Sequence, residues 1–286
     1  MTTLTNKTAL SKSLGIARSS LYYHPRKPLE DETIKQAILA VQSDHAAYGH
    51  KRIARDLGLN KKRILRVMKK FHLHPKVRRG VPFKPGDQGN PPTPVRNIAA
   101  TICPIRPNVL WVGDFTYLPW EGSFLYLATV LDVYSREIVG WHIGTRHTTD
   151  LVMAAFADAV MRQDCRPAIF HSDQGSEYVS GAYTAMLEQL GVAPSHSPKA
   201  SPWRNGYQES FYSNFKLELG NPKYYVDMGR LIEAIHRQIT YYNERRIHTS
   251  LNMSPLKFRT RYENKTTALS AVLFTNSSVI PSPMSV

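Results

Sequence analysis

The stretch VLWVGDFTYL at 109–118 decides the fold, together with FLYLATVLDVYS at 124–135 and EIVGWHIG at 137–144. All three are rich in β-branched and aromatic residues, which pack well on the pleated surface of a sheet and so favour strands. Between the first two lies Glu121-Gly122-Ser123, a composition that suits a hairpin turn. We therefore predict three consecutive strands, the first two of which form a hairpin.

Helices and strands alternate downstream of this region. The predicted elements are helices at 148–162, 178–191, 205–219 and 228–246, and strands at 167–173 and 192–197. The order β-β-β-α-β-α-β-α predicts an α/β fold that resembles the ribonuclease-H-like arrangement, a mixed sheet flanked by helices, over residues 108–262. Residues 263–286 are Ser/Thr-rich and weakly periodic, which predicts a mobile tail.

Three carboxylates occur along this pattern in an order that can bring them together. Asp114 lies inside the first predicted strand, Asp173 ends a short strand before a glycine turn, and Glu209 lies within a helix. Such elements can converge at one edge of a sheet, and a buried carboxylate needs a partner or a cation. Three oxygen ligands suit two Mg²⁺ ions, which can activate an attacking oxygen and stabilise the leaving oxygen at phosphorus.

Other acids compete for this assignment, because a single Asp or Glu is more often a helix cap or a salt-bridge partner. Asp132 is the strongest competitor, since it also lies in an apolar run. The spacing favours the first set: 209 − 173 = 36 positions separate Asp173 from Glu209, which leaves 35 residues between them. The remaining competitors are Glu121, Asp150, Glu177, Glu188 and Glu218.

The charge of the chain is concentrated near its N-terminus. The sequence has 37 Lys+Arg against 22 Asp+Glu, a formal net charge of +15. Twelve basic residues lie between Lys51 and Arg79, where Asp56 is the one acid. A block of one sign suggests contact with phosphates, whereas a solvated helix face usually mixes both signs. A basic but inert helical bundle is the alternative.

Apolar residues at helical spacing predict a small three-helix bundle within 31–79, with Asn60 capping a last helix from Lys61 to Lys70. We interpret this region as an all-α, helix-turn-helix-like DNA-binding domain with that helix as its candidate recognition helix. Residues 1–30 resemble a helix-turn-helix arm, and the Pro-rich stretch 80–107 is predicted to be a linker. The predicted DNA contacts of the bundle are Lys51, Arg52, Lys61, Lys62, Arg63, Arg66 and Lys69.

Three blocks around the acids resemble the catalytic blocks of the OrfB-type transposases of the third bacterial insertion-sequence family. These blocks are WVGDFTY at 111–117, HSDQGSEY at 171–178 and N-x-x-x-E-S-F-Y-x-x-x-K-x-E at 205–218. Downstream, a Y-N-x-x-R-x-H-x-x-L pattern at 242–251 matches the family, and upstream YGHKRI at 48–53 matches its small basic domain. The resemblance covers most of residues 10–260.

The resemblance implies a DDE transposase with a retroviral-integrase-like core, which cleaves DNA 3′ ends and transfers the strands. It implies Asp114, Asp173 and Glu209 as catalytic ligands of two Mg²⁺ ions, with Mn²⁺ as a substitute. The family often has W-D-N before the glutamate, whereas this chain has W-R-N at 203–205, which would alter DNA contacts without removing a ligand. The DNA contacts expected in the core are Arg204, Asn205, Lys216, Arg246 and His248.

The expected partners are double-stranded DNA, namely the element's terminal inverted repeats and its target, and further copies of the chain, because two ends must be cut. The family's full transposase is commonly a fusion with an upstream OrfA segment, so an OrfA protein or fusion is also expected. A metal-dependent nuclease of the same fold and a non-catalytic DNA-binding regulator stay open. RNA binding has little support, because no RNP-like aromatic strand motif occurs.

The sequence also indicates where the protein works. No stretch is long and apolar enough to span a membrane, and the N-terminus lacks the pattern of a signal peptide. Cys103 and Cys165 are isolated, which argues against a disulfide framework and a structural zinc site. We expect a cytoplasmic, nucleoid-associated bacterial protein.

Overall fold

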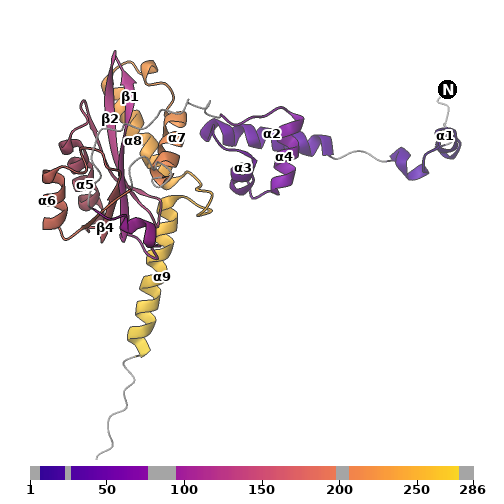
Figure 1. Cartoon of the computed structure of the whole chain (residues 1–286). Coiled ribbons are helices and arrows are strands. Elements are labelled where there is room, and N and C mark those ends of the chain that lie inside the picture. The colour runs from indigo at the N-terminus through magenta and orange to yellow at the C-terminus, as the bar shows by residue number, and fades with distance from the viewer. Residues whose placement is uncertain (1–6, 23–26, 77–94, 198–205, 277–286) are drawn as a thin grey trace, which may run out of the picture. The chain divides into compact units, whose positions relative to one another are not determined.

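A computed structural model describes residues 7–22, 27–76, 95–197 and 206–276 of the chain. The chain divides into two compact units, Met1–Lys76 and Val77–Val286 (Figure 1). No helix within the described ranges is long and apolar enough to cross a membrane.

The second unit is built on a five-stranded sheet with the order β3-β2-β1-β4-β5. Its strands are β1 (Leu110–Trp120), β2 (Ser123–Asp132), β3 (Ile138–Gly144), β4 (Ile169–Ser172) and β5 (Ala193–His196). The first three are antiparallel, whereas β4 runs parallel to both β1 and β5. Glu121 and Gly122 have positive φ angles of 43° and 78°, as a two-residue hairpin turn requires. The predicted α/β, ribonuclease-H-like mixed sheet is confirmed.

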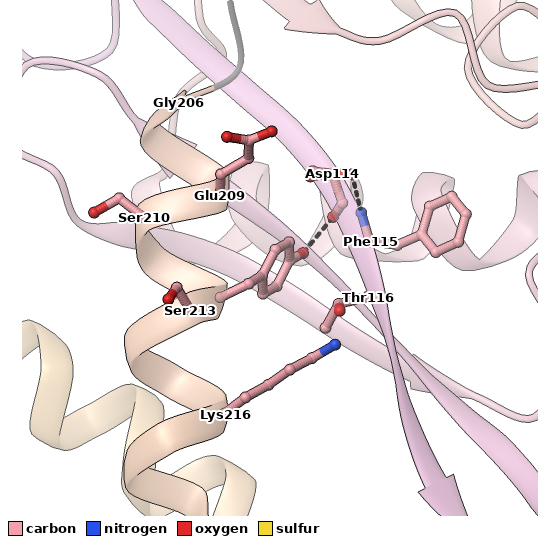
Figure 2. A pocket seen from close by; sticks show the side chains of 9 residues that line it. Asp114, Phe115, Thr116, Gly206, Glu209, Ser210, Ser213 and Lys216 are labelled. Atoms are coloured by element: carbon pink, nitrogen blue, oxygen red, sulfur yellow. Dashed lines mark hydrogen bonds between the residues drawn. The ribbon is translucent and has the colours of Figure 1, made fainter. Parts of the chain in front are cut away.

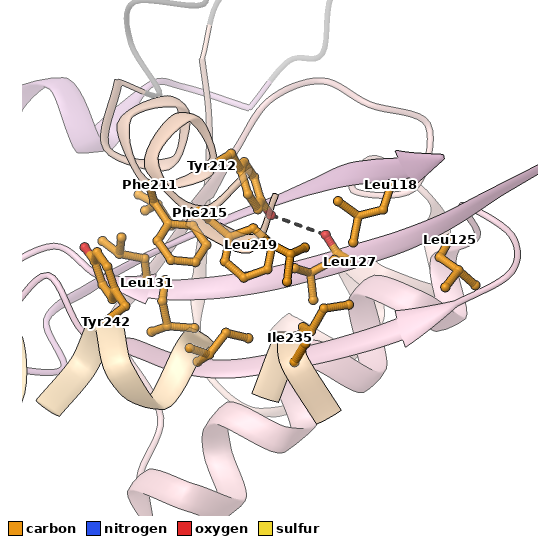
Figure 3. Close-up of a cluster of buried hydrophobic side chains, with 14 of the residues drawn as sticks. Leu118, Leu125, Leu127, Leu131, Phe211, Tyr212, Phe215, Leu219, Ile235 and Tyr242 are labelled. Atoms are coloured by element: carbon orange, nitrogen blue, oxygen red, sulfur yellow. Dashed lines mark hydrogen bonds between the residues drawn. The ribbon is translucent and has the colours of Figure 1, made fainter. Parts of the chain in front are cut away.

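Helices cover both faces of the sheet, because side chains of a strand alternate between its two faces. The covering helices are α5 (Thr149–Gln163), α6 (Gly181–Gln189), α7 (Gly206–Leu219) and α8 (Met228–Glu244). In β1, Trp111 packs with Phe156 of α5, while its neighbour Val112 belongs to the core that contains Phe215 of α7 and Ile235 of α8. Figure 3 shows this second core between the sheet and the two helices. The strand that carries Asp114 is therefore central and fixed from both sides.

Helix α9 (Pro255–Asn276) covers the first part of the stretch that was predicted to be a mobile tail. The helix continues through 263–276, a stretch that contains no Gly or Pro to break it. Two contacts hold its first half: the Tyr262 ring lies 5.4 Å from that of Tyr134, and Arg259 pairs with Glu137 at 3.2 Å. Both partners lie far away in the sequence, so the periodicity of the segment alone did not reveal them. Residues 277–286 lie outside the described part of the chain.

The first unit contains the predicted three-helix bundle, formed by α2 (Lys27–Asp44), α3 (His50–Asp56) and α4 (Lys61–Lys70). Its core includes Ile38, Ile53 and Ile64, none of which is exposed. The Asn60 side chain accepts a hydrogen bond from the Lys62 amide at 2.9 Å, which confirms the predicted cap. The arm before the bundle has α1 (Lys7–Ser13) and then a 3₁₀ turn, Arg18–Tyr22, in place of a second α-helix.

Most of the predicted linker, 80–94, lies outside the described residues. Its last part contains a short 3₁₀ helix, Ile98–Thr101, which packs against the core of the second unit through Ile98 and Ala99. The predicted domain boundaries otherwise stay predictions.

Candidate active site

Two of the three predicted acids become neighbours through strand register. In the parallel pair of β1 and β4, Val112 lies opposite His171. Continuing two residues along both strands reaches Asp114 on β1 and Asp173, the first residue after β4. Residues two apart point to the same face of a strand, so this register brings the two acids to one edge of the sheet. Gly113, next to Asp114, leaves the space that the Phe170 ring of β4 occupies.

Helix α7 is attached to β1 by a polar clamp, Gln208 and Tyr212, which lie one helical turn apart. The fully buried Gln208 amide donates to the carbonyl of Val112 at 2.8 Å and accepts from the Thr129 hydroxyl at 3.0 Å. The Tyr212 hydroxyl donates to the carbonyl of Asp114 at 2.6 Å. The clamp therefore fixes the helix across the backbone of Asp114 itself.

Glu209 follows Gln208 and shares an open cleft with Asp114. The cleft has a volume of about 620 Å³ and is also lined by Lys216, Thr116 and Ser210. Figure 2 shows Glu209 and Lys216 reaching from α7 toward β1. The Lys216 ammonium lies 4.7 Å from the centre of the Tyr117 ring. One carboxylate from the sheet, one from the helix and a cation therefore surround the same space.

The electrostatic environment of Asp114 opposes its ionised form. Burial raises the pKa of the Asp114 carboxyl well above the ordinary 3.8, and the charges of Asp173 and Glu209 raise it further. A hydrogen bond from the Phe115 amide, at 2.8 Å, and the charge of Lys216 lower that pKa but do not offset the increase. Asp173 and Glu209 thus lie close enough to Asp114 to oppose its negative charge.

The Asp173 side chain bonds within its own loop, accepting from the Gly175 amide at 3.0 Å. Loss of solvation by the surrounding protein atoms raises the pKa of the Asp173 carboxyl, and the charge of nearby Glu177 raises it further. The Glu177 side chain itself lies 2.7 Å from the His147 ring nitrogen Nδ1. Within the described ranges, no three His, Cys, Asp or Glu side chains are close enough together to hold one metal ion. The structure thus brings Asp114 and Glu209 to one cleft, with Asp173 beside them but turned into its loop.

Asp132, the strongest competitor, has a structural role. Its fully buried carboxylate accepts from the amides of Asn108 and Ser135, at 2.8 and 2.7 Å, and from the Ser135 hydroxyl at 2.7 Å. Glu218 is likewise committed, since it pairs with Arg246 at 3.0 Å. The other competing acids Glu121, Asp150 and Glu188 are exposed and do not line the cleft.

Known proteins carry the same core. Residues 104–202 and 190–255 match models of the integrase core domain. The chain is 34% identical to the transposase for insertion sequence element IS904 of Lactococcus lactis, over 84% of this chain and 98% of that protein. This chain belongs to the insertion-sequence transposases. It is also 30% identical to the transposase for IS629 of Shigella sonnei, over 86% of this chain and 88% of that one.

Among solved structures, the chain is similar to a simian T-cell lymphotropic virus intasome. The sequence identity is 18%, the TM-score is 0.49, and the match covers 77% of this transposase and 73% of the viral chain.

The other residues of the core that were predicted to contact DNA lie in different environments. Arg246 is 2% exposed and donates to Glu218 and, at 2.8 Å, to the Asn214 amide oxygen. Its prediction as a DNA contact is therefore corrected: the side chain is buried and ties α7 to the end of α8. His248 is partly buried, and its ring lies 2.9 Å from the Ser250 hydroxyl. Arg204 and Asn205 lie outside the described residues.

The basic helix α4 of the transposase has two differently used faces. One face turns toward α2, where Arg63 pairs with Glu30 at 2.8 Å and Arg66 pairs with Asp31, also at 2.8 Å. Lys61, Lys62 and Lys69 form the other, exposed face, and Lys51 is exposed on α3. Arg52 lies over the Tyr48 ring. The exposed lysines are thus better placed than Arg63 and Arg66 to meet an external partner.

Sequence reasoning missed Gln208 and Tyr212. The available signal was that Gln208 and Tyr212 carry polar groups on the side of α7 that packs on the sheet, where apolar residues are expected. Their partners are backbone carbonyls of β1 and the Thr129 side chain of β2, about 80 to 100 residues away in sequence. Local pattern alone could not assign those contacts.

Proposed function

We propose that this transposase hydrolyses the 3′ ends of its element and then uses each 3′-OH to attack another phosphodiester. Asp114, Asp173 and Glu209 would hold two Mg²⁺ ions, which Mn²⁺ can replace. The observation that carries the proposal is the Asp114 carboxyl, whose pKa is raised by burial and by the charges of the other two acids, at the edge of the cleft that Glu209 lines.

The residues present fit divalent cations. Carboxylate oxygens are the ligands that Mg²⁺ prefers, and bound positive charge would relieve the repulsion among the three acids. Asp173 would have to turn from its hydrogen bond with the Gly175 amide to join the other two. When bound, two such ions supply activation of an attacking oxygen and stabilisation of a leaving oxygen.

The side chains of the cleft supply the remaining roles. Lys216 provides positive charge beside the acids, which would hold a scissile phosphate close to them. The clamp of Gln208 and Tyr212 keeps α7, and with it Glu209, in register with Asp114. No hydroxyl is required as a nucleophile, so Ser210 serves as a cleft wall.

We further propose that the exposed lysines of α3 and α4 bind the duplex, through Lys51, Lys61, Lys62 and Lys69. The supporting observation is that these side chains are exposed, whereas Arg63 and Arg66 pair with the acids of α2. Lysines around one helix face suit phosphate contacts. The expected DNA is the element's terminal inverted repeats and its target.

Cutting two ends requires two active sites, so we propose a homo-oligomer on DNA, with an OrfA protein or OrfA fusion as a further partner. A DNA substrate also implies a cytoplasmic, nucleoid-associated protein. The relatives named as transposases favour strand joining over the alternative of a plain nuclease.

The deciding experiment is strand transfer on a labelled duplex that carries the element's terminal repeat, with Mg²⁺ or EDTA. We expect metal-dependent joined products from the wild type and none from Glu209→Gln, while Glu188→Gln on the surface of α6 behaves as wild type. Cleavage without joining, with OrfA also added, would favour the nuclease. DNA binding without chemistry in any protein would refute the assignment of the three acids.

A further inference from the structure

Helix α9 carries a row of cations far along the chain from the basic bundle. Lys257, Arg261 and Lys265 lie four residues apart, so they follow one another along the same side of the helix. All three are exposed. Figure 1 shows α9 running out past the end of the sheet. This row, Lys257, Arg261 and Lys265, is called the α9 cation row below.

Other side chains of α9 hold the helix against the rest of the unit. Phe258 and Tyr262 pack their rings against that of Tyr134, at 5.3 and 5.4 Å. Arg259, on the same inner side, pairs with Glu137 at 3.2 Å and with Glu263 at 2.7 Å. The row follows a neighbouring side of the helix, where its three side chains are exposed.

The three charges of the row have no ion-pair partner in the part of this unit that the structure describes. Glu263 is the one acid of α9, and Arg259 engages it. Among the described residues, no ion pair is formed by Lys257, Arg261 or Lys265, and such pairs do occur for most exposed arginines of α8 and α5. Three positive charges therefore face solvent along about 12 Å of helix, at 1.5 Å per residue.

The row also borders a hollow in the surface. An open cavity of about 730 Å³ lies along α9, and its walls include all three cations together with the polar side chains of Thr260 and Asn264. Glu244 at the end of α8 is the one acid among its walls. Cations combined with hydroxyl and amide groups are the set that proteins use to contact phosphate and sugar oxygens.

We propose that the α9 cation row binds the phosphate backbone of duplex DNA, as a second DNA surface located on the catalytic unit. The inference rests on the proposed function in that DNA is the substrate. Along one strand of a duplex a phosphate follows about every 3.4 Å of the axis, so a 12 Å row can lie beside about three of them. Such contacts hold DNA without selecting its sequence.

The test compares the full chain with two triple variants of equal charge change. The first is Lys257→Gln, Arg261→Gln and Lys265→Gln. The control is Arg106→Gln, Arg166→Gln and Lys223→Gln, which removes three exposed cations elsewhere in the same unit. All carry Glu209→Gln and are measured in EDTA, so binding is read without chemistry. The probes are a terminal-repeat duplex and a duplex of unrelated sequence, each from 50 to 200 mM salt.

Loss of three phosphate contacts lowers the slope of log affinity against log salt by about 2.7, since each contributes about 0.9. Over that fourfold salt range, the affinity of the Glu209→Gln parent would fall about 40-fold more than that of the α9 variant. Weakening on both duplexes supports a general backbone contact, and weakening on one of them assigns the row to element ends or to target. Equal slopes for the α9 variant, the control and the parent would overturn the inference.

The failure of the inference differs from that of the proposed function. If the α9 variant, in the catalytically competent background, keeps metal-dependent joining and the parental salt slope, the row is a solvated surface and the transposase mechanism stands. If joining is absent from the wild type while the slope still changes in the α9 variant, the DNA surface stands without the chemistry. Circular dichroism and thermal unfolding check that the exposed substitutions leave α9 folded.

Discussion

Asp114 and Asp132 lie on the two paired strands of one hairpin, and in sequence they look alike, since each is an aspartate within an apolar run. Their surroundings differ in one respect. Asp132 accepts three hydrogen bonds from Asn108 and Ser135, whereas the Asp114 carboxylate accepts one from the Phe115 amide and has two further acids nearby. A carboxylate whose donors are complete stabilises the fold, and one that faces other acids is available to a cation.

The largest effect should come from Asp114→Asn. The variant loses a proposed metal ligand, so strand transfer should fall at least about a hundredfold, because such ions supply several kcal/mol of barrier lowering. Quantitative strand transfer in Mg²⁺, with surface Asp150→Asn as the control, measures the loss. Activity within threefold of wild type would contradict the proposed site.

The same variant should be more stable without metal. Because the pKa of the Asp114 carboxyl is raised above the ordinary 3.8, the folded state holds the proton more tightly than the unfolded state does. The stability from that proton is present below pH 3.8 and is lost as pH rises through the raised pKa. At pH 7 in EDTA, asparagine should raise the melting temperature by about 2 °C or more, and below pH 3.8 the gain should vanish. An unchanged melting temperature at pH 7 would refute the raised pKa of the Asp114 carboxyl.

Asp132→Ala should instead lower stability and leave the strand-transfer activity unchanged. It leaves two buried amides and a buried hydroxyl without an acceptor, which should lower the free energy of unfolding by about 3 kcal/mol or more. Urea denaturation measures the loss. Strand transfer per folded molecule should stay near the wild-type value at low temperature, and a selective loss of activity would reopen Asp132 as a catalytic acid.

Tyr212→Phe should reduce strand-transfer activity by an intermediate amount. It removes the hydroxyl that donates to the Asp114 carbonyl, so activity should drop about 10- to 100-fold, as for residues that orient metal ligands. The matched control is Tyr225→Phe, whose hydroxyl donates at 2.9 Å to the Leu219 carbonyl at the far end of α7. The two variants should unfold at similar urea concentrations, and only Tyr212→Phe should raise the Mg²⁺ concentration needed for half-maximal activity.

Asp31 in the first unit extends the comparison to an acid among cations. Hydrogen bonds from Arg66 and Lys70 lower the pKa of its carboxyl below the ordinary 3.8. The stability that these ion pairs contribute to the folded state is fully present above pH 3.8 and is lost as the pH falls below that value. Asp31→Asn should therefore lower the unfolding temperature of the bundle at pH 6 but less and less below pH 3.8. Equal differences at both pH values would contradict the ion-pair account.

The smallest effect is expected for Ser210→Ala. Its hydroxyl lines the cleft, but the proposed chemistry needs no protein nucleophile. Strand transfer should stay within about twofold of wild type, measured beside Glu209→Gln. A loss as large as that of Glu209→Gln would instead indicate a covalent step through the serine.

The strands, the hairpin and the helix cap could be predicted because each depends on neighbours in sequence. The runs of β-branched and aromatic residues at 109–144 and the Asn60 cap are of this kind. The rest depends on distant partners. Tyr134 and Glu137 extend α9, Glu218 buries Arg246, and Thr129 engages Gln208, and none of these pairs lies within one element. The identities of the three acids came from spacing and resemblance, while the way Asp173 turns into its loop required coordinates.

The chain order of the two units also has a consequence in time. The bundle ends at Lys76, whereas α7, which carries Glu209, ends at Leu219, so 219 − 76 = 143 residues must follow before the cleft can close. Domains fold as units from the N-terminus during synthesis, at roughly 5–20 residues per second, so the ribosome needs about 7–30 s for this stretch. The pairing of β1 with β4 spans nearly 60 residues and is itself slow to form. On the proposed function, a growing chain can thus hold DNA well before it can cut it.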